Sequence, residues 1–199
     1  MKPVKTLKRI IVSESRLKLL QIFFYSVDGM FYVRQLTRLT KEKLNSIRRE
    51  LQNLKAAGIL ESEWRGNKLF YWINKKNPFY QEILAIIMKT KGLGGNLIKY
   101  RQKLGKIKFV IFSGRFITGF SSLGKKDLID LLLVGKIVLP ELGVLVREEE
   151  KVRSSEINYT VMNETDFAFR KKNRDPFLLQ ILLQPRIMII GSEEEMVNF

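Results

Sequence analysis

Hydrophobic residues recur at helical spacing through most of the first half of the chain. Ser13, a preferred N-cap residue, precedes an apolar run that contains Leu17, Leu20 and Phe24. This pattern predicts a helix that ends near the turn dipeptide Asp28-Gly29. A short strand over 30–32 and a second helix over about 33–39 are expected to follow.

A third helix is predicted to begin at Thr40, with residues 41–43 in its first turn. At about 100° per residue, its apolar side chains fall within about 60° of one another and form a buried stripe. They are Leu44, Ile47, Leu51 and Leu54. Arg can bind guanine and Asn can bind adenine in a bidentate manner, so a polar face with these residues suits the major groove of DNA. The candidate contacts of this helix and its first turn are Lys41, Lys43, Asn45, Ser46, Arg48, Arg49 and Gln52.

A β-hairpin is predicted after this helix. Strand-like runs over 59–64 and 69–73 flank Gly66-Asn67, which is a hairpin turn signal. Arg65 and Lys68 stand on either side of the tip, so the candidate contacts here are Arg65, Asn67 and Lys68. Three helices followed by a basic hairpin predict a winged helix-turn-helix. The alternative is an ordinary amphipathic helix whose polar face is only solvated.

The segment 12–74 resembles the winged-helix transcriptional regulators of bacteria and archaea. The resemblance lies in "RQLTRLTKEKLNSIRRELQNLKAAGILES" followed by "RGNKLFYWIN". It implies regulation of transcription through sequence-specific binding of duplex DNA. A homodimer is expected, because one recognition helix covers few base pairs and half-sites are usually paired.

The segment 78–106 is predicted to be a helical linker. Its first helix, 79–91, carries an apolar face made of Phe79, Ile83, Ile86 and Ile87. This face or the C-terminal domain is expected to supply the dimer contact. The run Gly92–Gly95 is predicted to break the helix before a second short helix over 96–105.

The second half alternates between strands and helices. A strand over 107–112 leads into Ser113-Gly114, and later strands are predicted over 127–135, 156–162 and near 186–190. Helices are predicted over 139–150, from Thr165 or Asp166, and in the segment that begins "DPFLLQILL". A small α/β domain over 107–199 is therefore expected.

This half resembles the minimal nucleotidyltransferase fold through its strand, its Gly/Ser turn and the later "IDLLLVG". In that family a Gly-Ser pair binds the triphosphate, and an Asp-x-Asp pair with a third acid holds two Mg²⁺. Here the pair is reversed, as Ser113-Gly114. Asp130 matches the second acid and Leu128 stands in place of the first.

Asp127 is one residue out of register, so on a strand it would face the opposite side. Asn158 or Glu156 could occupy the position of the third acid. The resemblance thus implies the fold without transfer of nucleotides, and we expect no catalytic residue, metal or cofactor. A vestigial nucleotide site would consist of Ser113, Gly114, Arg115 and Asp130.

The net charge of +16 over 199 residues is unevenly distributed. Residues 1–77 carry 17 Lys and Arg against 6 Asp and Glu, residues 78–106 carry 6 against 1, and residues 107–199 carry 13 of each. A basic excess confined to one end indicates a polyanionic partner, most often nucleic acid. Solubility alone and an anionic membrane surface are the alternatives.

The chain contains no Cys and no His. Disulfides, thiol nucleophiles, Ser-His-Asp triads and the usual zinc ligand sets are therefore excluded. Any catalysis would depend on carboxylates, lysines or hydroxyls, and any metal would be a hard cation such as Mg²⁺.

Together these patterns predict an α+β protein with a winged helix-turn-helix over 1–77, the linker over 78–106 and the nucleotidyltransferase-like domain over 107–199. The predicted function is a DNA-binding transcriptional regulator whose C-terminal pseudoenzyme domain serves assembly or the sensing of a nucleotide or small-molecule effector. The alternatives are an active Mg²⁺-dependent nucleotidyltransferase targeted by the winged helix, and an RNA-binding protein. Glu14, Arg16 and Lys18 interrupt any secretory signal, and no apolar run is long enough to span a membrane, so a cytoplasmic location is expected.

Overall fold

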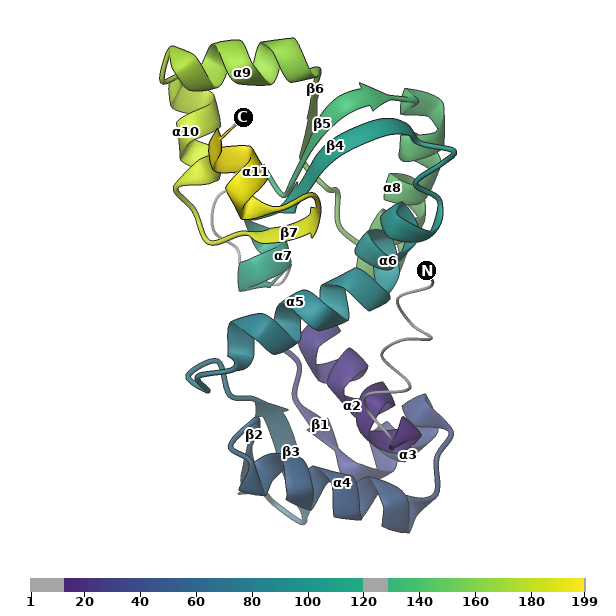
Figure 1. The fold of residues 1–199 in the computed structure, drawn as a ribbon. Helices are drawn as coiled ribbons and strands as arrows, with labels where there is room; N and C mark the ends of the chain where they lie inside the picture. Colours follow the sequence, from purple (N-terminus) through teal and green to yellow (C-terminus); the bar gives the residue numbers. More distant parts are fainter. Residues whose placement is uncertain (1–12, 120–128, 199) are drawn as a thin grey trace. The chain divides into compact units, whose positions relative to one another are not determined.

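The computed structural model describes residues 13–119 and 129–198, and the chain divides into two compact units at Lys91 (Figure 1). The fold is α+β, with a separate small sheet in each unit. No helix among the described residues is long and apolar enough to cross a bilayer.

The first unit is a winged helix-turn-helix. Its elements run in the order α2 (Glu14–Tyr25), β1 (Phe31–Tyr32), α3 (Val33–Thr40), α4 (Leu44–Ala56), β2 (Leu60–Arg65), β3 (Lys68–Ile73) and α5 (Tyr80–Thr90). The three strands form an antiparallel sheet in the order β1-β3-β2. The predicted N-cap of α2 is confirmed, since the Ser13 hydroxyl accepts a hydrogen bond from the Arg16 backbone N–H at 3.2 Å.

The β2–β3 hairpin forms the wing. Arg65 pairs with Lys68 at its end, so the turn consists of Gly66 and Asn67, as predicted. Gly66 has a φ of +59°, a conformation that L side chains adopt only under strain. The glycine therefore permits the tight connection that sets the register of the whole hairpin.

The apolar face of α5 differs from the prediction. Tyr80 stacks on Phe24 of α2 with ring centroids 5.5 Å apart, and this contact rotates the buried face of the helix onto Leu84, Ile87 and Met88. Only Ile87 of the predicted face is buried there. Phe79 and Ile86 are exposed, and Ile83 is half-buried.

The second unit is built on a four-stranded mixed sheet. Its elements are α6 (Gly92–Lys99), β4 (Gly105–Phe112), α7 (Arg115–Thr118), β5 (Leu131–Ile137), α8 (Leu139–Arg153), β6 (Tyr159–Met162), α9 (Glu164–Lys172), α10 (Pro176–Leu182), β7 (Ile187–Ile190) and α11 (Glu193–Asn198). The strand order is β6-β5-β4-β7, with β5 and β6 parallel and the other pairs antiparallel. Helices cover both faces of this sheet (Figure 1).

Both faces of β4 and β5 are buried. Phe109 and Ile111 join Leu132 and Val134 in a core cluster with Phe167 of α9 and residues of α10. Val110 and Leu133, on the other face, are equally inaccessible to solvent. This burial explains why the strands read as continuous apolar runs in the sequence.

The predicted break at Gly92–Gly95 is wrong, because these residues form the start of α6. Leu93 and Leu97 are buried, and α6 contacts α8. The Glu149 carboxylate of α8 also accepts a hydrogen bond from the Leu93 N–H at 2.8 Å. Tertiary packing and a cap from a distant residue therefore overcome the weak helical propensity of glycine.

The segment 78–106, predicted as a linker, is divided between the two units. α5 belongs to the first unit and α6 to the second. The end of the segment also contains Gly105, the first residue of β4.

Candidate nucleic-acid interface

The helix-turn-helix consists of α3, a three-residue turn and α4. The predicted start of the third helix at Thr40 is wrong: Thr40 is the last residue of α3, and its hydroxyl donates to the Leu36 carbonyl at 2.8 Å. Lys41 follows with a φ of +57°, and α4 begins only at Leu44. Lys41 and Lys43 are therefore exposed residues of the turn rather than of a helical first turn.

The inner face of α4 holds it against the core. Ile47, Leu51 and Leu54 are buried as predicted, whereas Leu44 is half-buried. Glu50, which the apolar stripe did not include, is also buried and accepts hydrogen bonds from Ser13 Oγ and Arg16 Nε, both at 2.8 Å. This ion pair ties α4 to the start of α2.

The environment of Glu50 shifts its acidity. Burial alone would raise the pKa of this carboxyl, but the hydrogen bonds from Arg16 and Ser13 outweigh burial and lower the pKa below its ordinary value. Glu50 is therefore charged at neutral pH and holds the orientation of α4.

The outer face of α4 carries the residues expected to contact DNA. Asn45, Arg48, Arg49 and Gln52 are exposed, and Ser46 is half-buried. Since Ile47, Leu51 and Leu54 fix the opposite face in the core, these polar side chains all extend from a rigidly held helix.

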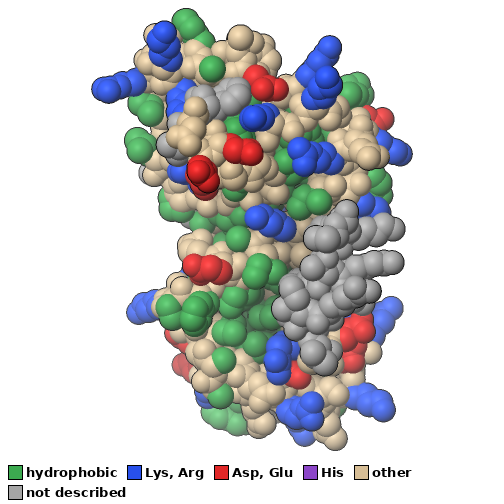
Figure 2. Space-filling view, in the orientation of Figure 1, with side chains coloured by type: hydrophobic (Ala, Val, Ile, Leu, Met, Phe, Trp, Pro, Cys, Tyr) green, Lys and Arg blue, Asp and Glu red, His purple; other side chains and the backbone are tan. Residues whose placement is uncertain are grey.

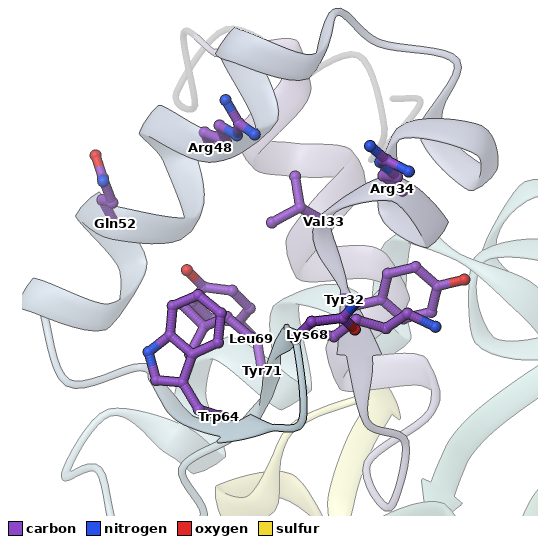
Figure 3. A pocket seen from close by; sticks show the side chains of 10 residues that line it. Tyr32, Val33, Arg34, Arg48, Gln52, Trp64, Lys68, Leu69 and Tyr71 are labelled. Atoms are coloured by element: carbon purple, nitrogen blue, oxygen red, sulfur yellow. The ribbon is translucent and has the colours of Figure 1, made fainter.

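A groove of about 420 Å³ separates α4 from the wing (Figure 3). Arg48 and Gln52 line it from α4, Arg34 from α3, and Asn67 and Lys68 from the hairpin. The aromatic side chains of Tyr32, Trp64 and Tyr71 complete its lining together with Val33 and Leu69. Four of the predicted contacts, Arg48, Gln52, Asn67 and Lys68, are thus brought together in one groove, with basic and aromatic side chains side by side.

A second recess of about 480 Å³ shares Tyr32, Arg34 and Lys68 with this groove. Thr37 and Arg38 of α3 and Leu44 of α4 form the rest of its lining. The two hollows therefore form one continuous surface along α3, α4 and the wing. Asn45, Arg49 and Arg65 do not line either hollow.

The two basic residues at the wing tip differ in their surroundings. Arg65 forms an ion pair with Glu63 at 3.3 Å. Lys68 lies over the ring of Tyr32, with Nζ 4.9 Å from its centroid, and Tyr32 packs edge-on against Phe70. Lys68 is therefore held at the groove, whereas part of the charge of Arg65 is neutralised.

The six acidic residues of segment 1–77 all have partners away from the groove. Glu14 and Glu42 lie near Lys18, Glu50 pairs with Arg16, Asp28 with Lys75, Glu63 with Arg65, and Glu61 accepts a hydrogen bond from Trp72. Within the part of the chain that the structure describes, the groove cations Arg34, Arg48 and Lys68 have no ion-pair partner. The groove therefore keeps its positive charge for a ligand.

The sequence reasoning missed the contribution of α3 and of the aromatic residues. Arg34 and Arg38 are both exposed and lie four residues apart, so they share one face of α3. That spacing could have identified them. Trp64 and Tyr32 gave no such signal, because aromatic residues in a strand are usually part of a core.

The residues of the predicted nucleotide site lie together at the start of β5 in the second unit. Asp130 is completely buried. It accepts hydrogen bonds from the backbone N–H of Arg115 at 2.9 Å and of Asn158 at 3.0 Å, and from Nε of Arg115 at 3.1 Å. The Ser113 hydroxyl donates to the Ile129 carbonyl.

Gly114 makes the close approach of this turn possible. Its φ is +51°, and a Cβ there would lie 2.9 Å from Oδ1 of Asp130 and 3.1 Å from the Ile129 carbonyl. Arg115 also donates to Ser155 Oγ and to the Glu156 carbonyl. The four residues thus bind one another and the neighbouring backbone.

The other residues considered for this site are placed differently. Asn158 and Glu156, proposed for the third acid position on a strand, precede β6, which begins at Tyr159. Asp127 and Leu128 lie outside the described residues. No cluster of three or more potential metal ligands occurs in residues 13–119 and 129–198.

Comparisons with known proteins add little beyond this geometry. No protein-family model matches the chain, and no curated protein matches it. Among solved structures, it is similar to reduced HlyU from Vibrio cholerae N16961, with 18% identity and a TM-score of 0.33 over 44% of this chain and 85% of that one. It is also similar to a protein described as a possible transcriptional regulator from Methanosarcina mazei Go1. The identity is 16% and the TM-score is 0.35, over 51% of this chain and 88% of that one. Human N-acetylserotonin methyltransferase in complex with SAM matches at 14% identity and a TM-score of 0.29, over 49% of this chain and 32% of that one.

Proposed function

We propose that this protein is a transcriptional regulator that binds duplex DNA through α4 and the wing. The groove between them carries the proposal, because Arg34, Arg48 and Lys68 meet there without an acidic partner among the described residues. A helix of 13 residues with exposed Asn45 and Arg49 fits a major groove, which admits an α-helix and presents a distinct pattern for each base pair.

A merely solvated polar face explains the groove less well. Solvation requires no arrangement of cations from three separate elements around one hollow, and it gives no reason for all six acidic residues of segment 1–77 to be engaged elsewhere. The excess of 17 Lys and Arg over 6 Asp and Glu in residues 1–77 supports the same partner.

The second unit serves assembly or the sensing of a ligand in this proposal, and it does not transfer nucleotides. Asp130 supports this view, since its two oxygens accept four protein N–H groups, two of them from the Arg115 guanidinium. A catalytic carboxylate that held Mg²⁺ would need free oxygens facing a ligand. The exposed residues Phe79 and Ile86 of α5 support self-association into a homodimer.

Selection from a random duplex pool tests the DNA-binding proposal. The full chain should enrich a defined sequence, and its affinity should fall steeply as salt increases, because phosphate contacts release counterions. The double variant Arg48→Ala/Lys68→Ala should lose most of this affinity. Lys76→Ala is the matched control, since Lys76 is an exposed lysine of the same unit that does not line the groove.

Two results would reject the proposal. One is an unchanged duplex affinity in the double variant. The other is a clear preference for single-stranded RNA of the same length over duplex DNA, which would favour the RNA-binding alternative. Incubation of the protein with labelled nucleoside triphosphates, Mg²⁺ and protein or RNA acceptors tests the second unit, where transfer of label would restore the enzyme alternative.

A further inference from the structure

The two tryptophans of the chain lie on the wing but differ in their surroundings. Trp72 of β3 donates from its indole N–H to Glu61 at 3.0 Å. Trp64 of β2 is 68% exposed, and its indole N–H has no hydrogen-bond partner among the described residues. A large aromatic side chain in water contributes little to the fold, so the position of Trp64 calls for another explanation.

Trp64 forms part of the groove between α4 and the wing. It pairs across the hairpin with Leu69, and both residues line the groove (Figure 3). Arg48 and Gln52 line the same groove from α4, and Arg34 lines it from α3. The groove therefore offers an apolar surface on the side of the hairpin and hydrogen-bond donors on the side of the helices.

This combination matches the chemistry of a sugar–phosphate strand. Phosphate oxygens need cations and N–H donors, whereas a deoxyribose ring presents C–H groups that pack well on an aromatic face. A pure phosphate site would not need Trp64, and an apolar ligand site would not need the basic residues Arg34, Arg48 and Lys68.

We propose that the groove holds the sugar–phosphate backbone of one strand of the bound duplex, and that Trp64 packs its indole against a deoxyribose of that strand. The inference rests on the proposed function and adds the part of the DNA that this groove binds. Arg48 and Lys68 contact phosphates on either side of the sugar. The indole N–H donates to an oxygen of the same backbone.

The proposal separates two kinds of contribution to affinity. Arg48 and Lys68 neutralise phosphates, so each should add about 0.9 to the slope of log affinity against log salt. Trp64 is uncharged and should leave this slope unchanged. Because every nucleotide has a deoxyribose, loss of Trp64 should weaken all duplex sequences by a similar factor, on the order of tenfold for an interface tryptophan.

Fluorescence of Trp64 provides the direct test. In a Trp72→Phe variant of the full chain, Trp64 is the sole source of tryptophan emission. Addition of a selected duplex should shift or quench this emission in step with binding measured by anisotropy of labelled DNA. Trp64→Phe is the matched control, in which the remaining Trp72 should respond much less.

Affinity measurements complete the test. Trp64→Ala should lower the affinity for selected and random duplexes alike by about tenfold, at an unchanged salt slope. Trp64→Phe keeps an aromatic ring at this position and should therefore bind duplexes more tightly than Trp64→Ala does. Circular dichroism should show an unchanged fold, because the exposed indole is not part of the core. Duplex binding with no Trp64 response and a normal Trp64→Ala affinity would overturn this inference and leave the proposed function intact. No duplex binding by the wild-type protein would overturn both.

Discussion

Arg115 contacts Asp130 from both its backbone and its side chain. The Arg115 N–H and Nε lie 2.9 and 3.1 Å from Oδ1 of a carboxylate that is completely inaccessible to solvent. The resemblance to the nucleotidyltransferase fold matches Asp130 with a metal-binding acid of that family. In the structure its carboxylate instead accepts hydrogen bonds from the Arg115 and Asn158 backbone amides.

This pair leads to a prediction about stability. Asp130→Asn removes the charge that compensates the Arg115 guanidinium and should lower the free energy of unfolding of the second unit by about 3–5 kcal/mol. Asp166→Asn, at an exposed carboxylate of α9, should change it by no more than about 0.5 kcal/mol. Urea unfolding followed by circular dichroism measures both. Equal effects of the two substitutions would show that the buried pair is not structural.

Arg49 and Lys68 should differ in their effects on DNA binding. Arg49→Ala should reduce base preference at one position by about 1–3 kcal/mol if the exposed guanidinium binds a base edge. Lys68→Ala should weaken all sequences alike and reduce the salt slope by about one. Binding to a set of singly substituted operators at several salt concentrations distinguishes the two patterns. A uniform loss for Arg49→Ala would mean that this residue contacts only the backbone.

Glu50 should make the stability of the first unit depend on pH. Its pKa is lower in the folded than in the unfolded state, so its contribution is present above the unfolded pKa and is lost as pH falls through the folded pKa. Unfolding free energy should therefore decline below about pH 4.5, where an unfolded glutamate begins to take up a proton. Glu50→Gln should be less stable at neutral pH and should show a shallower decline. An unchanged pH profile would refute this role.

Glu149 should hold the first turn of α6. It accepts from the Leu93 N–H and pairs with Arg153 at 2.6 Å, and both charged side chains are buried. Glu149→Ala should speed hydrogen exchange at the amides of 93–96 and destabilise the second unit by about 3–5 kcal/mol. Glu148→Ala, at the exposed neighbouring residue, is the control and should leave exchange in α6 unchanged.

The uncovered apolar residues of α5 should promote self-association. Phe79→Ser together with Ile86→Ser should shift the protein toward the monomer in sedimentation experiments at tens of micromolar. Phe169→Ser removes an equally exposed aromatic residue from α9 and should have no such effect. A wild-type protein that sediments only as a monomer would contradict the homodimer proposal.

Local chemistry in the sequence was sufficient for much of the first unit. Ser13 as N-cap and Gly66-Asn67 as hairpin turn depend on neighbouring residues alone, and both are confirmed. Thr40 is also a good N-cap by composition, but its hydroxyl bonds back to Leu36 within the preceding helix. A threonine can occur at the first or at the last turn of a helix, so the residue type alone does not show which end of a helix it marks.

Distant contacts explain the remaining differences. Gly92–Gly95 form a helix because Glu149, more than fifty residues away, caps it. The rotation of α5 depends on the stacking of Tyr80 on Phe24. Trp64 becomes a candidate site residue only when the wing is placed beside α4. None of these relationships is encoded in a short window of sequence.

The engagement of all six acidic residues of segment 1–77 with other partners has a kinetic consequence. An anion that reaches Arg34, Arg48 and Lys68 does not have to displace an internal carboxylate, so no ion pair needs to break before the encounter complex forms. The positive potential then acts on the approaching partner from a distance and accelerates its capture. For the proposed DNA partner, the association rate should therefore depend on diffusion and on the ionic strength of the solution more than on rearrangement of the protein.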